Sequence, residues 1–161
     1  MSLSISQTSR LQHQYETLSE LVRGIPEEQL KLRVIPEKWS AFEQIAHLTA
    51  YQPVFLQRMV AIGLEQGLSF ERYVADNDPV FHDCCKKALK ELSDDLATQR
   101  FLIIRHLTDL PEQSLRRNAR HPKFGLLSIP GWTEFFLLHE AHHLFSIFML
   151  TQELKQKLLQ S

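Results

Sequence analysis

Apolar residues recur every three or four positions along much of the chain, which is the spacing of a helix that buries one face. Four segments show this pattern, at residues 11–25, 40–63, 79–110 and about 128–154. No segment shows a sustained alternation of apolar and polar positions, the pattern of a half-buried strand. The pattern therefore predicts an all-α chain with four long helices and no sheet.

The start of the second helix is sharply marked. Ser40 and Glu43 form a Ser-x-x-Glu capping box, in which two side chains bond free backbone N–H groups of the first turn. Trp39 precedes the cap as the apolar residue of a hydrophobic staple. The segment that follows is apolar on most sides. We therefore expect the second helix to lie at the centre of the bundle.

The connection between the second and third helices indicates their relative direction. It reads GLEQGLSFERYVADND, residues 63–78, and its periodicity is weak. Antiparallel neighbours in a bundle need only a short turn, whereas a connection of this length can travel the whole bundle. We therefore predict a four-helix bundle in which a long crossover leaves helices two and three parallel. One such domain is expected over residues 1–161.

Composition and charge narrow the classes of function. A hydrophobic fraction of 43% and a charged fraction of 23% are typical of a globular domain. The formal net charge of −1 gives no global attraction to nucleic acid or to an anionic membrane, so neither is expected as a partner. No stretch approaches the roughly 20 apolar residues of a membrane span, and the first residues contain no apolar segment of the kind expected of a signal peptide. Cys84 and Cys85 are adjacent and rarely suited to a disulfide, which favours the cytoplasm.

The fourth helix carries the string His-Glu-Ala-His-His at residues 139–143. It matches the H-E-x-x-H motif, in which two histidines bind zinc and the glutamate acts as a base. His139 and His143 lie about 40° apart on a helix, and both fall on its apolar stripe. An unsatisfied polar group in a core costs about 1–3 kcal/mol, so both imidazoles need partners. Those partners are either a metal ion or hydrogen bonds to carbonyls, Gln44 or Tyr51.

His47 on the second helix favours the metal. A third inward histidine on a neighbouring helix completes a His₃ site and leaves one tetrahedral position for water or substrate. Three imidazoles suit zinc, nickel, iron and copper. A protease is disfavoured, because Ser146 and Met149 stand where a metzincin has glycine and its third histidine. Glu140 lies off the axis of the stripe and is kept as a candidate catalytic residue, as a proton acceptor.

The segments KWSAFEQIAHL and FFLLHEAHHLFSIF resemble the DinB/YfiT-like superfamily. The resemblance extends over the whole chain through the helix order and the long crossover. It implies a four-helix bundle in up-down-down-up order, with a long crossover between helices two and three, in which His47, His139 and His143 hold a divalent metal. Characterised members of the superfamily include thiol S-transferases that use bacillithiol or mycothiol, and a mycothiol-dependent maleylpyruvate isomerase. Members often carry Gly-Gln after the last histidine, whereas Leu144 and Phe145 follow here.

These observations predict a metal-dependent enzyme with a small-molecule substrate. The metal is expected to be zinc or nickel, with iron as a further option. The resemblance favours a thiol-dependent S-transferase that uses a low-molecular-weight thiol. A metal-dependent hydrolase and a non-catalytic metal- or ligand-binding module of the stress response are the alternatives. Apolar residues beside the core stripe of helix three, such as Phe101 and Ile104, predict a homodimer.

The remaining histidines, cysteines and basic residues are expected to have mainly structural or solvent-exposed positions. His106 lies near the inner face of helix three, where it is either a core residue or part of the site. A basic run could attract an anionic substrate, although such runs in loops are usually solvated; it comprises Arg116, Arg117, Arg120 and Lys123. Cys84 and Cys85 are expected in the core. Solvent-exposed or neighbouring positions are expected for His13, His82, His121 and His142.

Overall fold

Helix α4, Ala41–Leu64, is the central element of the computed structural model, which describes residues 3–160. Its predicted capping box is confirmed: the Ser40 hydroxyl accepts from the Glu43 N–H at 3.1 Å, and the Glu43 carboxylate accepts from the Ser40 N–H at 2.7 Å. The helix is buried along most of its first three turns. It packs against α6, Leu89–Asp109, and α8, Ile129–Gln160.

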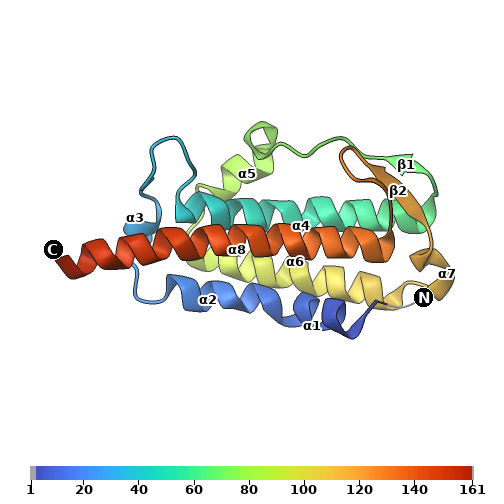
Figure 1. The fold of residues 1–161 in the computed structure, drawn as a ribbon, viewed down its shortest axis with the longest axis horizontal. Coiled ribbons are helices and arrows are strands. Elements are labelled where there is room, and N and C mark those ends of the chain that lie inside the picture. Colours follow the sequence, from blue (N-terminus) through green and yellow to red (C-terminus); the bar gives the residue numbers. More distant parts are fainter. Residues whose placement is uncertain (1–2, 161) are drawn as a thin grey trace.

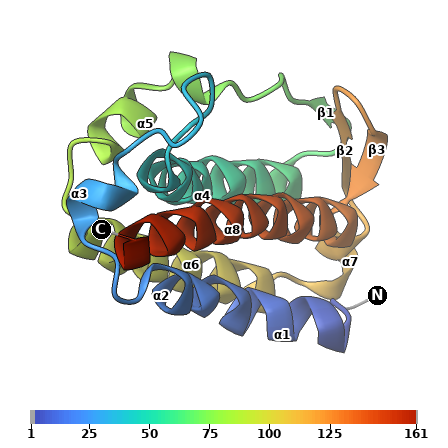
Figure 2. The same ribbon diagram turned by 60° about the vertical axis from the view of Figure 1, so that its left-hand side comes forward.

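The helices run in the predicted up-down-down-up order (Figure 1). The first bundle element and α8 run in one direction, and α4 and α6 run in the other (Figure 1). The predicted crossover joins the end of α4 to the start of α6 and returns along the length of the bundle (Figures 1 and 2). It carries three short elements, β1 (Leu68–Ser69), the 3₁₀ turn η2 (Ala75–Asn77) and α5 (Pro79–Cys84).

Two of the four predicted helices are interrupted. The first consists of α1 (Ile5–His13), the 3₁₀ turn η1 (Gln14–Glu16) and α2 (Thr17–Val22). The third was expected without a break from Pro79 to Pro111, but the chain leaves the helix between α5 and α6. The first turn of α6 is bonded there by two carboxylates: Glu91 accepts from the Ala88 N–H and Glu27, of α3 (Glu27–Leu30), from the Leu89 N–H. Apolar spacing continues across the break, so the periodicity concealed it.

The expectation that the chain has no sheet is wrong. A small sheet of order β1-β2-β3 closes one end of the bundle, with β2 at Asn118–His121 and β3 at Gly125–Ser128. Strand β1 pairs parallel to β2, and β2 and β3 form an antiparallel hairpin that follows α7, Glu112–Leu115. Strands of two to four residues are too short to show alternation in the sequence. The sheet leaves the bundle architecture intact and places the hairpin beside α8 (Figure 2).

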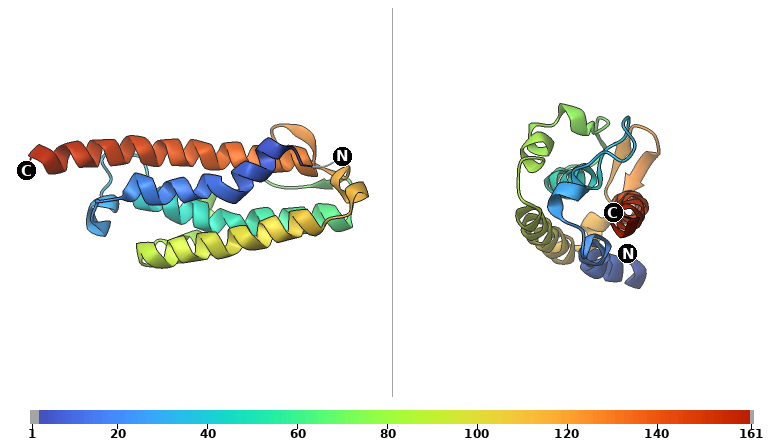
Figure 3. Two further views of the ribbon diagram at one scale, coloured as in Figure 1. Left: turned by 90° about the horizontal axis from the view of Figure 1, so that it is seen from below. Right: turned by 90° about the vertical axis from the view of Figure 1, so that its left-hand side faces the viewer.

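A buried polar network joins all four elements of the bundle. Arg100 on α6 is fully buried; it donates to Gln52 on α4 at 3.1 Å and to the Leu11 carbonyl of α1 at 3.1 Å. Its guanidinium also forms an ion pair with Glu140 on α8. Gln14 donates to the Glu140 carboxylate at 2.9 Å. The right-hand view of Figure 3 shows the four elements of the bundle end-on.

Residues 1, 2 and 161 of the expected single domain lie outside the described part of the chain, and its extent stays a prediction. Within residues 3–160, no helix combines the length and the apolar character that crossing a bilayer requires.

Candidate metal centre

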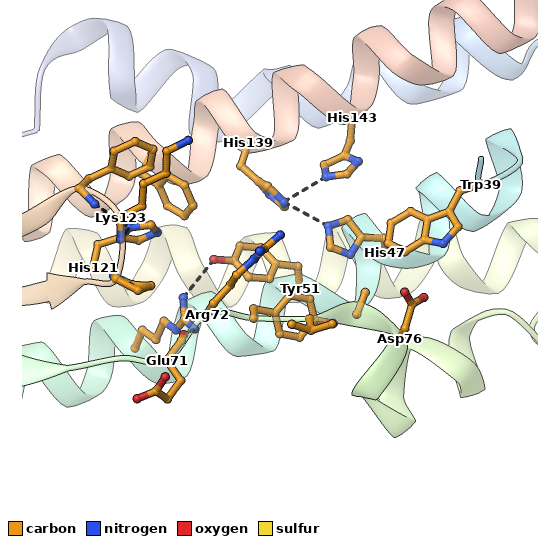
Figure 4. Close-up of a pocket in the computed structure, with 17 residues that line it drawn as sticks. Trp39, His47, Tyr51, Glu71, Arg72, Asp76, His121, Lys123, His139 and His143 are labelled. Carbon is orange, nitrogen blue, oxygen red and sulfur yellow. Dashed lines mark hydrogen bonds between the residues drawn. The ribbon is translucent and has the colours of Figure 1, made fainter. Parts of the chain in front are cut away.

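Three histidines from two helices converge on one point. His47 of α4 and both His139 and His143 of α8 direct their Nε2 atoms toward one another (Figure 4). The His139 Nε2 lies 3.1 Å from the His47 Nε2 and 3.1 Å from the His143 Nε2. Nitrogens bound to one tetrahedral zinc at about 2.0–2.1 Å lie about 3.3 Å apart. The spacing of the three imidazoles therefore fits a single divalent cation.

Aromatic side chains fix the orientation of the imidazoles. Trp39, just before the α4 cap, lies over His47 with ring centroids 5.2 Å apart, and over His143 at 6.5 Å. Tyr51, one helical turn after His47, contacts the His139 ring at 4.6 Å. The cap that starts α4 thus sets the register of Trp39, His47 and Tyr51 at once. The capping box, a local signal in the sequence, therefore positions the part of the site that α4 carries.

The hydrogen bond between His143 and Gln44 selects the tautomer of His143 that a metal requires. The Nδ1 of His143 donates to the Gln44 Oε1 at 2.5 Å, which leaves the lone pair of the neutral ring on Nε2. The Nδ1 atoms of His47 and His139 are buried, and neither has a hydrogen-bond partner among the described residues. Each neutral imidazole carries a single N–H proton, so the three Nε2 atoms that face one another cannot all be hydrogen-bonded to each other. A cation between the Nε2 atoms satisfies them together.

The triad is neutral at physiological pH. Burial, together with the neighbouring imidazoles, lowers the pKa of His47, His139 and His143 to about 3. A neutral imidazole is the form that binds metal, because the proton and the cation compete for the same lone pair.

A cavity of about 700 Å³ opens beside the histidines, within the size range of small-molecule sites. Its walls come from α4, from residues 71–76 of the crossover, from residues 121–124 of the hairpin and from α8. Aromatic rings form much of the lining, namely those of Trp39, Tyr51, Tyr73, Phe124 and Phe135. The crossover and the hairpin thus close over the face of α4 and α8 that carries the triad.

Glu140 lies on the other side of α8. Its side chain is 1% exposed, faces Arg100 and Gln14, and is absent from the cavity lining. In an H-E-x-x-H protease the glutamate is the base that faces the metal-bound water. The geometry does not support this role for Glu140, and its part in proton transfer stays a prediction.

The sequence predicts that His121 of the hairpin is exposed to solvent, but the structure places it in the wall of the cavity. His121 is half-buried and lines the cavity, where its Nδ1 accepts from the Lys123 and Phe124 N–H groups. The other histidines outside the triad are not part of the lining, namely His13, His82, His106 and His142. Cys84 is buried and Cys85 half-buried, and burial raises the pKa of both thiols, as expected of core cysteines.

The basic residues of the cavity differ from those of the predicted basic run. Only Lys123 of that run lines the cavity, and Arg117 instead donates to the Gly63 carbonyl. Arg58 and Arg72 line the cavity and were missed. Arg58 follows His47 by eleven residues, which places both on one face of α4, so the helical spacing contained this signal. Arg72 lies in the irregular crossover, where the sequence has no comparable signal.

Comparisons with known proteins support the architecture. The chain matches the model of the DinB superfamily over residues 10–147. The solved structure of YfiT from Bacillus subtilis, described as a probable metal-dependent hydrolase with an unusual four-helix bundle topology, is similar with a TM-score of 0.80 and 16% identity, over 96% of this chain and 91% of that chain. TT2238, a four-helix bundle protein, gives a TM-score of 0.65 and 18% identity, over 88% and 95%. A comparison with curated proteins gives no significant match.

Proposed function

Because the chain belongs to the DinB superfamily, we propose that it is a metal-dependent enzyme in which His47, His139 and His143 hold one divalent cation. The observation that carries the proposal is the convergence of three neutral imidazoles at the wall of a small-molecule cavity. A cation bound there lowers the pKa of a coordinated water or thiol and so supplies a nucleophile at neutral pH. Gln44 orients His143 through its Nδ1–H.

The position of Glu140 favours a thiol as the nucleophile, and hence an S-transferase. The carboxylate that would serve as the base for a water molecule is held by Arg100. A thiol needs no such base, because coordination to a cation deprotonates it. A low-molecular-weight thiol and the free, buried Cys84 both suit a reducing compartment, so we place the protein in the cytoplasm. The donor set suits zinc, nickel or iron.

A hydrolase is the second candidate, favoured by the description of YfiT as a probable metal-dependent hydrolase. In that case the nucleophile is water, and His121 or Asp76 at the cavity wall would have to take up its proton. A non-catalytic module of the stress response is the third.

Cobalt substitution distinguishes the three candidate functions, namely the S-transferase, the hydrolase and the binding module. We expect one equivalent of Co²⁺ to bind, and N-acetylcysteine to add a sulfur-to-cobalt charge-transfer band, because the three histidines leave one coordination position for the thiol. His142→Ala, an exposed neighbour of the triad, is the matched control and should behave as the parent protein. A Co²⁺ spectrum unchanged by thiol, together with ester hydrolysis by the zinc form, would favour the hydrolase. A spectrum unchanged by thiol without hydrolysis would favour the binding module.

We also propose that the protein forms a homodimer. Phe101 on α6 is 63% exposed, whereas Ile104 is half-buried against the core. The outer face of α8 carries a second apolar stripe, with Leu138, Phe145 and Met149 more than half exposed. Light scattering at micromolar concentration should give twice the chain mass of 18.8 kDa. Phe101→Glu and Phe145→Glu identify the face, because a charge in the contact should produce monomers. A monomeric parent protein would contradict the proposal.

A further inference from the structure

Three basic side chains that line the cavity have no ion-pair partner among the described residues. Arg58 comes from α4, Arg72 from the crossover and Lys123 from the β2–β3 hairpin, and all three line the cavity. None of them forms an ion pair with any residue between 3 and 160, although ten other basic side chains outside the histidines do. Positive charge has therefore been gathered at this place from three separate parts of the chain.

Arg58 is held in a fixed orientation. Its Nη1 donates to the Tyr51 hydroxyl at 3.3 Å, and its Nη2 donates to the Glu71 carbonyl at 2.9 Å. The guanidinium also lies over the Phe70 and Trp132 rings, 5.3 and 5.6 Å from their centroids. A guanidinium has five N–H donors in a rigid plane, so these two bonds leave donors for a ligand.

Glu71 and Asp76 also line the cavity, and within residues 3–160 neither forms an ion pair with Arg58, Arg72 or Lys123. Figure 4 shows the Glu71 carboxylate directed away from the histidines, and Asp76 at the opposite end, near Trp39. Arg72 extends into the cavity in the same view. Burial lowers the pKa of His121, and the charges of Arg58 and Lys123 lower it further, as expected where the two cations approach one imidazole.

We propose that Arg58, Arg72 and Lys123 form an oxyanion subsite, which binds a carboxylate or phosphate group of the substrate. The aromatic rings of Phe124 and Phe135 beside it hold an apolar body. The subsite selects small acids and holds them with the anionic group at the basic end of the cavity. The placement of the reactive part of the substrate at the three histidines rests on the proposed function. Anion binding itself needs no metal.

Fluorine NMR of three matched probes tests the subsite. The probes are 4-fluorobenzoate, 4-fluorophenyl phosphate and the neutral 4-fluorobenzamide, each titrated into the protein as isolated and after removal of metal with EDTA. We expect at least one anion to bind the metal-free parent protein about tenfold or more tightly than the amide, since a hydrogen bond to a charged group contributes more than one to a neutral group. The preferred anion distinguishes a carboxylate from a phosphate site.

Variants of two of the three cations test whether they bind the anion. Arg72→Gln and Lys123→Gln should each weaken the preferred anion about tenfold and leave the amide unchanged. Arg120→Gln is the matched control: it makes the same charge change on the same hairpin, but its side chain is exposed and outside the cavity lining. Equal binding of anion and amide, or equal weakening by the Arg120 and Arg72 substitutions, would overturn the subsite. Anion binding in a protein that takes up no metal would leave the subsite standing and contradict the proposed function.

Discussion

Replacing His139 by alanine should abolish stoichiometric metal binding while the bundle stays folded. The Nε2 of His139 is the atom within 3.1 Å of both other imidazoles, so its loss leaves two donors on separate helices. We expect the affinity for zinc to fall by more than the roughly 10–100-fold that loss of a hydrogen-bond partner of a ligand costs. Competition with a chromophoric chelator measures this change, and circular dichroism reports the helical content.

Companion variants establish that the three histidines act together. His47→Ala and His143→Ala should lose metal to a similar degree, and the His47→Ala/His139→Ala double variant should lose little more, because ligands of one ion are not additive. Gln44→Leu removes only the acceptor of the His143 Nδ1–H and should weaken binding about 10–100-fold. Histidines with a purely structural role would give a different result. The parent protein would bind no stoichiometric metal, and each alanine variant would be destabilised by about 1–3 kcal/mol.

Features that depend on local helix geometry were predicted correctly. The capping box fixed the start of α4 at Ser40, and helical spacing then placed His47 inward. The same spacing brought His139 and His143 onto one face of α8. These predictions hold because a helix places residue i+4 beside residue i whatever lies around it. The inward stripe of α8 also positioned the apolar residues that are buried there, from Trp132 to Leu154.

Features that depend on how the chain returns along the bundle were missed. The β-strands have only two to four residues, and β1 pairs with β2 because the crossover meets the hairpin, which no local pattern records. The same meeting brings Arg72 and Lys123 to one cavity. Arg100 is a different case, because it follows Leu96 by four residues and so stands within the apolar stripe of α6. A charged residue at a core position of that kind was a signal for a buried ion pair.

The second prediction with a large expected effect concerns the contribution of Arg100 to stability. Arg100→Met should destabilise the protein by about 3–5 kcal/mol, because it leaves the Glu140 carboxylate buried without its cation. The change also removes the hydrogen bonds to Gln52 and to the Leu11 carbonyl, and the contacts of the guanidinium with the Tyr15 and Phe136 rings. Such a loss is a large part of the roughly 5–15 kcal/mol that stabilises a typical domain. Urea unfolding monitored by circular dichroism measures it.

Glu140→Gln distinguishes an effect on the stability of the protein from an effect on zinc binding. Glu140→Gln should also destabilise the protein, because Arg100 then remains buried without a carboxylate, yet it should keep zinc, since Glu140 faces away from the triad. Arg100→Met/Glu140→Leu removes both charges and should recover much of the loss, as apolar residues of similar volume often replace a buried ion pair at little cost. Together with the single variants Arg100→Met and Glu140→Leu, it forms a double-mutant cycle, in which additive effects would contradict the coupling of the two residues. Loss of zinc in a folded Glu140→Gln protein would instead contradict the separation of Glu140 from the metal centre.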